Sequence, residues 1–416
     1  LAQQAMNAFG YVILTGKTFT TGATINNPNE VLLNTADGEY YKWTGSFASG
    51  PKVVPASSTP ARTGGIGPGA WIGVGDASLR TALAALTGAG LVGLSVGTTY
   101  PANTVGSAIQ YRTPQMYGIE PSTTNIIGAG LDAMFAAGGD IRFEKPGTYI
   151  TDRTWVLRSG TRLWIGPGVT IKLANGSNVP VFKNYSNATA DAYIEIWGPG
   201  TIDYNGANQT VVGLGSMASI LKGITSLKIG GGIKVIGANK YAWLVCNVTY
   251  LTAVGLNFDT NSDGLHCQPP IRHSYIRNLK GKTGDDMLAF TIGDYANYNI
   301  SEPGDFSNVD VAGLFCESAL CAVKMTGDGT GNFVRFRVSG IYGDTLHAVF
   351  RVWGDTNLTK TSVKYLTIED VHAVPGSAYN TIEIDDRGFG TSGYSIEIDE
   401  IHIKNVYTAN NTQQTV

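Results

Sequence analysis

The sequence is short of charge, of cysteine and of long apolar runs. Only 15% of its 416 residues are charged, and the formal net charge is −3. This balance leaves no basic footprint, so we do not expect nucleic acid as a ligand. No apolar run is long enough to span a membrane and no signal peptide is visible, so we expect no membrane partner.

Cysteine occurs at four positions: Cys246, Cys267, Cys316 and Cys321. All four lie inside strand-like runs, without the spacing of a metal site or of a disulfide-dense framework. We therefore predict buried free thiols, no metal and no cofactor, in a chain folded in a reducing cytoplasm.

Glycine is abundant, with 54 residues, and Val, Ile, Thr and Tyr are frequent. This composition favours a β-rich protein with many tight turns. A chain of this length exceeds one ordinary compact core unless it is a repeat solenoid. Because it begins at Leu1 and not at Met, we expect a fragment or a processed product.

Residues 1–75 are predicted to form a small β module. Gly10–Leu14 and Tyr40–Trp43 have the composition of short strands, and turn residues separate them. Pro51–Gly69 is dense in Pro, Gly and Ser, which is typical of a linker. Nothing in this module indicates a catalytic site.

Residues 76–118 are predicted to form a neck, and residues 119–416 a second domain. Asp76–Leu86 has a helical pattern with an N-cap at Asp76. Leu131–Ala137 predicts a second short helix that stops at a glycine pair. Short alternating strands follow this helix at close intervals, as at the first turn of a β-solenoid.

Internal repeats determine the fold prediction for the second domain. Six segments alternate apolar residues and end on a branched apolar anchor: Leu256, Leu279, Leu314, Ile341, Val371 and Ile401. These anchors are 23, 35, 27, 30 and 30 residues apart. The irregular interval suits a right-handed parallel β-helix, whose turns tolerate loops of variable length. The alternative is a large β-sandwich, but hairpin turns are scarce. We therefore predict an all-β fold, a parallel β-helix.

Acidic residues follow the anchors and should stack on adjacent turns, one strand spacing apart. The predicted catalytic group is Asp263, Asp285, Asp286 and Glu317, with Asp344 one turn further along. Close carboxylates repel, so one of them keeps a proton near neutral pH, which supplies an acid beside a base. Glycoside hydrolysis uses such a pair, at a separation that differs between retaining and inverting enzymes. The alternatives are turn-capping aspartates and a Ca²⁺ site.

Further polar and aromatic side chains lie near the acids along the same turns. The predicted substrate-binding residues are His266, Lys324, Asp344, His347, Arg351 and Trp353. Lys324 and Arg351 could hold an acidic sugar, and Trp353 could stack on a sugar face. The alternative is that Trp353 packs locally and that the two bases pair with acids such as Glu383. His266 and His347 are placed in one column, as acid–base groups or as hydrogen-bonded strand histidines.

The acidic motifs resemble those of polygalacturonase-type glycoside hydrolases. Asn261-Ser262-Asp263-Gly264, then Gly284-Asp285-Asp286, then Arg351-Val352 match the N-x-D, G-D-D and R-I-K elements of that inverting family. The resemblance implies that Asp285 or Asp286 is the general acid, that Asp263 and the other aspartate activate water, and that Arg351 binds substrate. The family's G-H-G element is missing, and the turn aligned with it reads Cys316-Glu317-Ser318-Ala319.

Nearly the whole chain resembles a bacteriophage tailspike depolymerase. The resemblance rests on the β module, the neck that starts at Gly65-Ile66-Gly67-Pro68-Gly69, the short helix and the β-helix. It implies a homotrimer on the virion tail, joined to the tail, the baseplate or another tailspike through the N-terminal module. It also implies a bacterial capsule, O-antigen or exopolysaccharide as substrate. Such proteins usually continue into C-terminal trimerisation modules, so we expect the C-terminal end to be truncated.

Three functions remain open. The first is a tailspike glycosidase, and the second is a polysaccharide lyase on the same fold. The third is a tail spike that binds its receptor without cleaving it.

Overall fold

The computed structural model describes residues 10–75, 108–184, 191–354, 360–385 and 396–407. The chain divides into two compact units, Leu1–Ser95 and Val96–Val416. The predicted helix Asp76–Leu86 and most of the predicted neck lie outside the described residues. Among the residues that are described, no helix is long and apolar enough to cross a membrane.

The N-terminal unit is a small β fold. Its elements are β1 (Val12–Thr18), β2 (Ala23–Ile25), β3 (Glu30–Leu33), β4 (Tyr40–Trp43), β5 (Lys52–Val54), the 3₁₀ helix η1 (Ala61–Thr63) and β6 (Trp71–Gly73). The order β1-β3-β4-β6 forms one sheet and β2-β5 another. Trp71 is fully buried and packs edge-on against Phe19, with ring centroids 4.8 Å apart. The prediction of a linker at Pro51–Gly69 is wrong, because β5 pairs with β2 and buries Val54 in this core.

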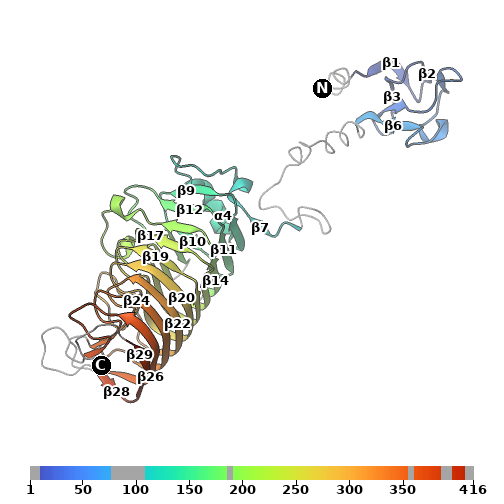
Figure 1. Ribbon diagram of the computed structural model, residues 1–416. Coiled ribbons are helices and arrows are strands. Elements are labelled where there is room, and N and C mark those ends of the chain that lie inside the picture. The colour runs from blue at the N-terminus through green and yellow to red at the C-terminus, as the bar shows by residue number, and fades with distance from the viewer. Residues whose placement is uncertain (1–9, 76–107, 185–190, 355–359, 386–395, 408–416) are drawn as a thin grey trace. The chain divides into compact units, whose positions relative to one another are not determined.

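The second unit is a parallel β-helix, as predicted (Figure 1). Its first elements are β7 (Tyr111–Arg112), η3 (Pro114–Tyr117), η4 (Gly128–Leu131), α4 (Asp132–Ala137), β8 (Asp140–Phe143), β9 (Gly147–Thr151), β10 (Trp155–Leu157), β11 (Thr161–Ile165), β12 (Val169–Leu173), β13 (Phe182–Asn184), β14 (Asp191–Trp197), β15 (Thr201–Asp203), η5 (Gly206–Asn208) and η6 (Leu214–Ser216). The later strands are β16 (Ser219–Gly230), β17 (Lys234–Ile236), β18 (Trp243–Val254), β19 (Asn257–Thr260), β20 (Leu265–Thr283), β21 (Leu288–Thr291), β22 (Phe306–Ser318), β23 (Val323–Gly327), β24 (Phe333–Asp344), β25 (Phe350–Gly354), β26 (Thr361–Val374), β27 (Ile382–Asp385), β28 (Ile396–Ile398) and β29 (Ile401–Tyr407).

Helix α4 packs on the first turns of the β-helix. It ends at the predicted glycine pair. Gly138 ends it at φ 63°, a conformation that glycine adopts without strain. Phe135 of α4 stacks on Trp155 of β10 with ring centroids 4.7 Å apart. The apolar face of the helix therefore closes the end of the core, so that the first strands do not expose it.

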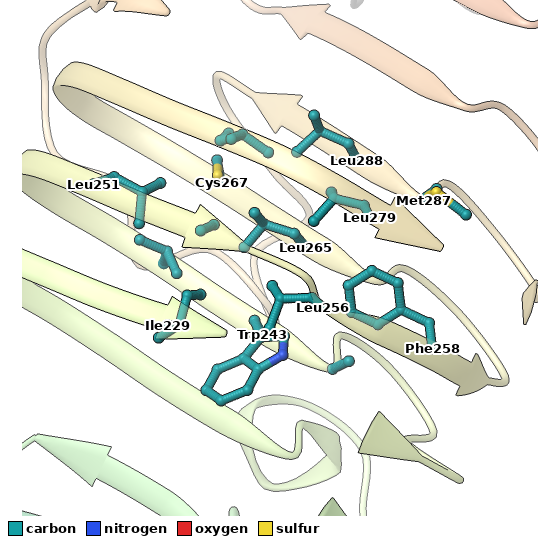
Figure 2. Packing of buried hydrophobic residues seen from close by; sticks show 14 of the residues in the cluster. Ile229, Trp243, Leu251, Leu256, Phe258, Leu265, Cys267, Leu279, Met287 and Leu288 are labelled. Atoms are coloured by element: carbon teal, nitrogen blue, oxygen red, sulfur yellow. The ribbon is translucent and has the colours of Figure 1, made fainter. Parts of the chain in front are cut away.

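Inward-facing apolar residues stack from turn to turn along the interior. Leu265 pairs in register with Trp243 on one side and with Leu288 on the other. Both leucines and Trp243 are fully buried, and Figure 2 shows their side chains in the packed interior. Burying each leucine stabilises the fold by roughly 1.5–3 kcal/mol. This stack fixes the register of the residues just before each strand.

The predicted anchors are confirmed except for the last one. Leu279, Leu314, Ile341 and Val371 pair in one continuous register. Ile401 pairs instead with Leu366, and Val371 pairs with Val406. The last repeat was misaligned because Ile396–Ile401 has the same alternating pattern as the true anchor segment, five residues later.

Candidate active site

The three leading aspartates lie in the turns just before β20 and β21. Leu265 pairs with Leu288, so Asp263 and Asp286, each two residues earlier, occupy equivalent positions on adjacent turns. The backbone confirms this register, because Gly264 N–H donates to Asp286 O at 2.9 Å. Tyr241 occupies the equivalent position one turn earlier, since Trp243 pairs with Leu265.

Small residues and threonines shape these turns. A Cβ atom on Gly284 would lie 2.2 Å from Asn261 O, so only glycine fits against the turn below. Thr283 Oγ1 donates to Asp285 O at 2.8 Å. Thr260 repeats this bond one turn earlier, donating to Ser262 O at 3.0 Å. Both turns are thus held by threonine hydrogen bonds, and the Asp263 carboxylate adds a further one by accepting from Asp286 N–H at 3.2 Å.

Asp263, Asp285 and Asp286 form the cluster that the sequence predicted. Carboxylate oxygens of the three lie within 4.8 Å of one another. They line a pocket of about 300 Å³. The Asp285 side chain is 32% exposed, whereas that of Asp286 is 3% exposed, so Asp285 offers the more accessible carboxylate.

His266 connects Asp263 to a second acidic residue, Asp294. Its Nδ1 lies 2.6 Å from Asp263 Oδ2, and its Nε2 lies 3.2 Å from Asp294 Oδ2, at ion-pair distance but without good hydrogen-bond geometry. Asp294 also accepts hydrogen bonds from Tyr241 Oη at 2.7 Å and from Gln268 Nε2 at 2.8 Å. The Tyr241 ring stacks on the imidazole with centroids 3.6 Å apart.

These contacts shift the pKa values of the three aspartates in opposite directions. Burial by itself raises the pKa of Asp263, but the bond to His266 and its charge outweigh burial and lower it. Burial and the charges of Asp263 and Asp285 raise the pKa of Asp286 to about 7, against the opposing effect of Lys324. Burial and the charge of Asp263 also raise the pKa of Asp285. The cluster therefore holds a fixed anion beside a pair that retains a proton.

Two lysines flank the carboxylates. Lys324 Nζ lies 3.4 Å from Asp286 Oδ2, and Lys240 Nζ lies 4.0 Å from Asp285 Oδ2. An acidic cluster of this kind can hold a hard cation such as Ca²⁺. Here each aspartate already faces a protein cation, which fits acid–base chemistry better than ion binding.

Arg351 and Trp353 lie on β25, further along the helix. Lys324 pairs in register with Arg351, and Arg351 with Glu383. Arg351 Nε lies 3.4 Å from Glu383 Oε2 and its guanidinium packs on the Trp353 ring, 4.2 Å from the centroid. Trp353 lines the pocket, whereas Arg351 is not among its lining residues. For Arg351 the structure therefore shows the alternative, an ion pair with Glu383.

His347 does not share a column with His266, and that expectation is wrong. His266 pairs with Ala289, and Ala289 with Lys324. The His347 backbone N–H instead donates to Leu320 O at 2.9 Å, in the turn that follows Asp285. Burial and the charges of Arg351 and Lys324 lower the pKa of His347 to about 4, so this imidazole is neutral at neutral pH.

Glu317 and Asp344 are not part of the cluster, so their predicted stacking on Asp286 is wrong. Glu317 is the extra residue of a bulge in β22, because Gly281 pairs with Cys316 and Lys282 with Ser318. Both acids are exposed, and Glu317 lines a separate surface depression. The register places Cys321, two residues before Val323, in the position beside Asp286.

Sequence reasoning missed several lining residues, among them Lys240, Tyr241, Asp294 and Tyr295. Tyr241 could have been found by extending the aspartate column one turn towards the N-terminus. Asp294 lies in the loop after β21, where no repeat pattern marks it. The four cysteines are free and buried, as predicted.

Comparison with known proteins finds a family match for the N-terminal part of the chain. Residues 4–76 match the family described as the tail spike TSP1/Gp66 receptor binding N-terminal domain. A capsule KL64-specific depolymerase of Klebsiella phage P510 is 31% identical over 193 residues, which cover 45% of this chain and 17% of that protein. The chain thus matches only a small part of the length of this curated relative.

The chain is also similar to solved structures, at low sequence identity. Tailspike protein 3 of bacteriophage CBA120 is 17% identical, with 99% of this chain and 78% of that chain covered and a TM-score of 0.29. The polygalacturonase of Erwinia carotovora ssp. carotovora is 15% identical, with 70% and 92% covered and a TM-score of 0.48.

The fold and the site thus define a parallel β-helix with an acidic pocket on its side. Residues 4–76, which precede the β-helix in the sequence, match the tail spike N-terminal domain family.

Proposed function

We propose that the chain belongs to a phage tailspike that binds a bacterial surface polysaccharide and hydrolyses its glycosidic bonds. The N-terminal unit would attach the spike to the virion tail, and the β-helix would act at the host surface as part of a homotrimer. The tail spike domain and the depolymerase relative support the polysaccharide and the location. The carboxylate pocket supports the chemistry.

One observation carries the proposal of hydrolysis. Three carboxylates within 4.8 Å of one another differ in protonation, because His266 keeps Asp263 ionised while burial and mutual repulsion keep a proton on the Asp285–Asp286 pair. Glycoside hydrolysis needs an acid and a base on the same bond, and opposite pKa shifts in neighbouring groups identify them.

In this mechanism, Asp285 is the general acid, since its side chain is the more exposed of the pair. Its proton passes to the glycosidic oxygen as the bond from that oxygen to the anomeric carbon breaks. A water attacks the anomeric carbon, and its proton passes to Asp263. Asp286, whose backbone N–H donates to Asp263 Oδ1 at 3.2 Å, holds that carboxylate and the water in place.

The rest of the pocket would bind sugar units on either side of the cleaved bond. Trp353 and Tyr295 offer aromatic surface, and Lys324 and Lys240 offer donors to hydroxyl or carboxylate oxygens. Arg351 would act behind Trp353, by fixing its ring, and not by direct contact with substrate.

The first experiment separates hydrolysis from elimination. The full chain is incubated with purified capsule and O-antigen polysaccharides of candidate hosts, and new reducing ends are counted while near-ultraviolet absorbance is recorded. Reducing ends without absorbance from an unsaturated uronic acid support hydrolysis. Products that absorb would favour a lyase.

Variants then test the site. Asp263→Asn and Asp285→Asn should each lower kcat by a factor of about 100 or more, as for loss of a general base or acid. Asp286→Asn should also lower kcat, because its carboxyl shares the proton of the Asp285–Asp286 pair. Glu317→Gln is the matched control, because this exposed acid lies outside the pocket, and its activity should equal that of wild type. Polymer binding without cleavage by the wild type would favour a receptor-binding spike.

A further inference from the structure

His266 lies deep in the site in an unusual environment for a histidine. Its side chain is 4% exposed and lies between two carboxylates, Asp263 at 2.6 Å and Asp294 at 3.2 Å. One face of its ring is covered by Tyr241, nearly parallel at 6°. Both ring nitrogens therefore face carboxylates of the protein.

More than one hydrogen bond holds the Asp294 carboxylate in place. Its carboxylate accepts hydrogen bonds from Tyr241 Oη at 2.7 Å and Gln268 Nε2 at 2.8 Å. Its own side chain is 4% exposed. Gln268 is on β20, two residues beyond His266, and Tyr241 precedes β18. Residues of the neighbouring turn and of the same strand thus hold the anion next to the imidazole.

The charges facing His266 come from every adjoining turn. Asp263 precedes β20, Asp294 follows β21, and Asp285 and Asp286 lie between them. Lys240 and Lys324 line the same pocket from the turn before β18 and from β23. The two lysines lie beside Asp285 and Asp286, so the two acids nearest to the ring, Asp263 and Asp294, depend mainly on His266 for neutralisation.

We propose that His266 is a fixed imidazolium, clamped by Asp294, Tyr241 and Gln268, and that it positions Asp263 as a permanently ionised base. This assigns His266 and Asp294 as positioning residues and removes His266 from the substrate-binding group. The role of His266 in positioning the base Asp263 rests on the proposed hydrolysis. The charge state of the imidazole ring does not depend on it.

The charge state has a clear physical basis. A histidine shuttling protons needs one nitrogen that gains and loses its proton during the reaction. A ring that faces a carboxylate at each nitrogen is stabilised in the doubly protonated form. Burial alone lowers the pKa of His266, yet the two carboxylates outweigh burial and raise it to about 9.

The ring can be observed directly, because the chain contains only five histidines. Selective ¹⁵N and ¹³C labelling of histidine in the full chain, with His266→Gln to assign the signal, reports both ring nitrogens across a pH series. The proposal predicts that His266 keeps both protons at pH 7 and loses one only near pH 9. A neutral ring at pH 7 would overturn it. This readout requires no substrate, so it is independent of whether the hydrolysis proposal holds.

Substitution of the clamp tests the positioning role. Asp294→Asn keeps an acceptor for Tyr241 and Gln268 but removes the second charge, so the His266 titration should fall by about one pH unit or more. Tyr241→Phe is the matched control: it keeps the aromatic ring and both charges, and its shift should be smaller. An unchanged titration in Asp294→Asn would refute the clamp.

The pH profile of kcat/KM separates a positioning role of His266 from a purely structural one. Without the imidazolium, the buried Asp263 should become harder to ionise, so in His266→Gln the acidic limb of kcat/KM should move to higher pH by about one unit. A purely structural role would lower the rate at every pH without moving this limb, and that result would contradict the positioning role. Asp294→Asn should not move the limb to higher pH, because the ring stays protonated at that pH and Asp263 loses a neighbouring negative charge. His266→Asn, with a shorter amide, keeps the test open if His266→Gln does not fold.

Discussion

The stability of Asp286→Asn as a function of pH tests the electrostatics of the site without any substrate. The Asp286 side chain is 3% exposed, and burial with the charges of Asp263 and Asp285 raises its pKa to about 7. In an unfolded chain, an aspartate titrates near pH 3.9. Between these two values the folded protein keeps a proton that the unfolded chain has lost. Stability must therefore fall as pH rises through this window, and the loss is complete above about pH 7.

The magnitude follows from the size of the shift. One pKa unit corresponds to 1.36 kcal/mol, so a shift of about three units gives an upper limit of roughly 4 kcal/mol. Because Asp263 and Asp285 share the same field, we expect about 2 kcal/mol in practice. Asparagine has nearly the shape of the protonated carboxyl and never ionises. Asp286→Asn should therefore match wild type near pH 4 and exceed its stability by about 2 kcal/mol at pH 8, while losing activity.

Hydrogen exchange measured by mass spectrometry on peptides from β20 and β21, at several pH values with urea added, isolates this part of the β-helix from the N-terminal unit. Asp259→Asn is the control, because this carboxylate of β19 is 61% exposed and its pairing with Lys234 is worth little. A stability gain in Asp286→Asn that is equal at pH 4 and pH 8, or absent at both, would refute the reasoning.

Three further predictions concern the turns, the pocket wall and the thiols. Gly284→Ala should destabilise the fold by about 1–3 kcal/mol, because the new Cβ would lie 2.2 Å from Asn261 O, and a lowered urea midpoint would show it. Trp353→Ala should raise KM about tenfold with a smaller change in kcat, measured with the cleaved polysaccharide, because an aromatic wall binds ground state and transition state alike. The four buried cysteines should react with a thiol reagent only after unfolding, and rapid labelling of the native chain would contradict their burial.

The fold and half of the site could be predicted because both depend on a short-range repeat. Asp263 and Asp286 precede buried leucines that pair directly, Leu265 and Leu288, so counting back from an apolar residue gave the correct neighbours. The same counting would have identified Tyr241, one turn earlier. In these turns the local pattern and the register agree.

The third turn was misaligned because its apolar residues do not mark the start of the strand. Four residues separate β22 from β23, as four separate β20 from β21, but Leu320 lies in this turn and resembles the first residue of a strand. Aligning on the nearest apolar residue therefore selected Ser318, whereas the register selects Cys321. Asp294 was missed for another reason: it reaches the site from a loop after β21, and no periodicity reports where such a loop returns.

The stacked turns also explain why the acid cluster ends after two of them. Adjacent strands lie about 4.8 Å apart, so a carboxylate at every turn would accumulate repulsion along the helix. Here the turn before the cluster carries Lys240, and the turn after it carries Cys321 and Lys324. The Cys321 thiol stays neutral, because burial and the charge of Asp286 raise its pKa well above the usual value. A third acid at that position would remove the asymmetry between Asp263, which has His266 as a counterion, and Asp286, which has to keep a proton. The site thus depends on a stack that is short and closed by cations at both ends.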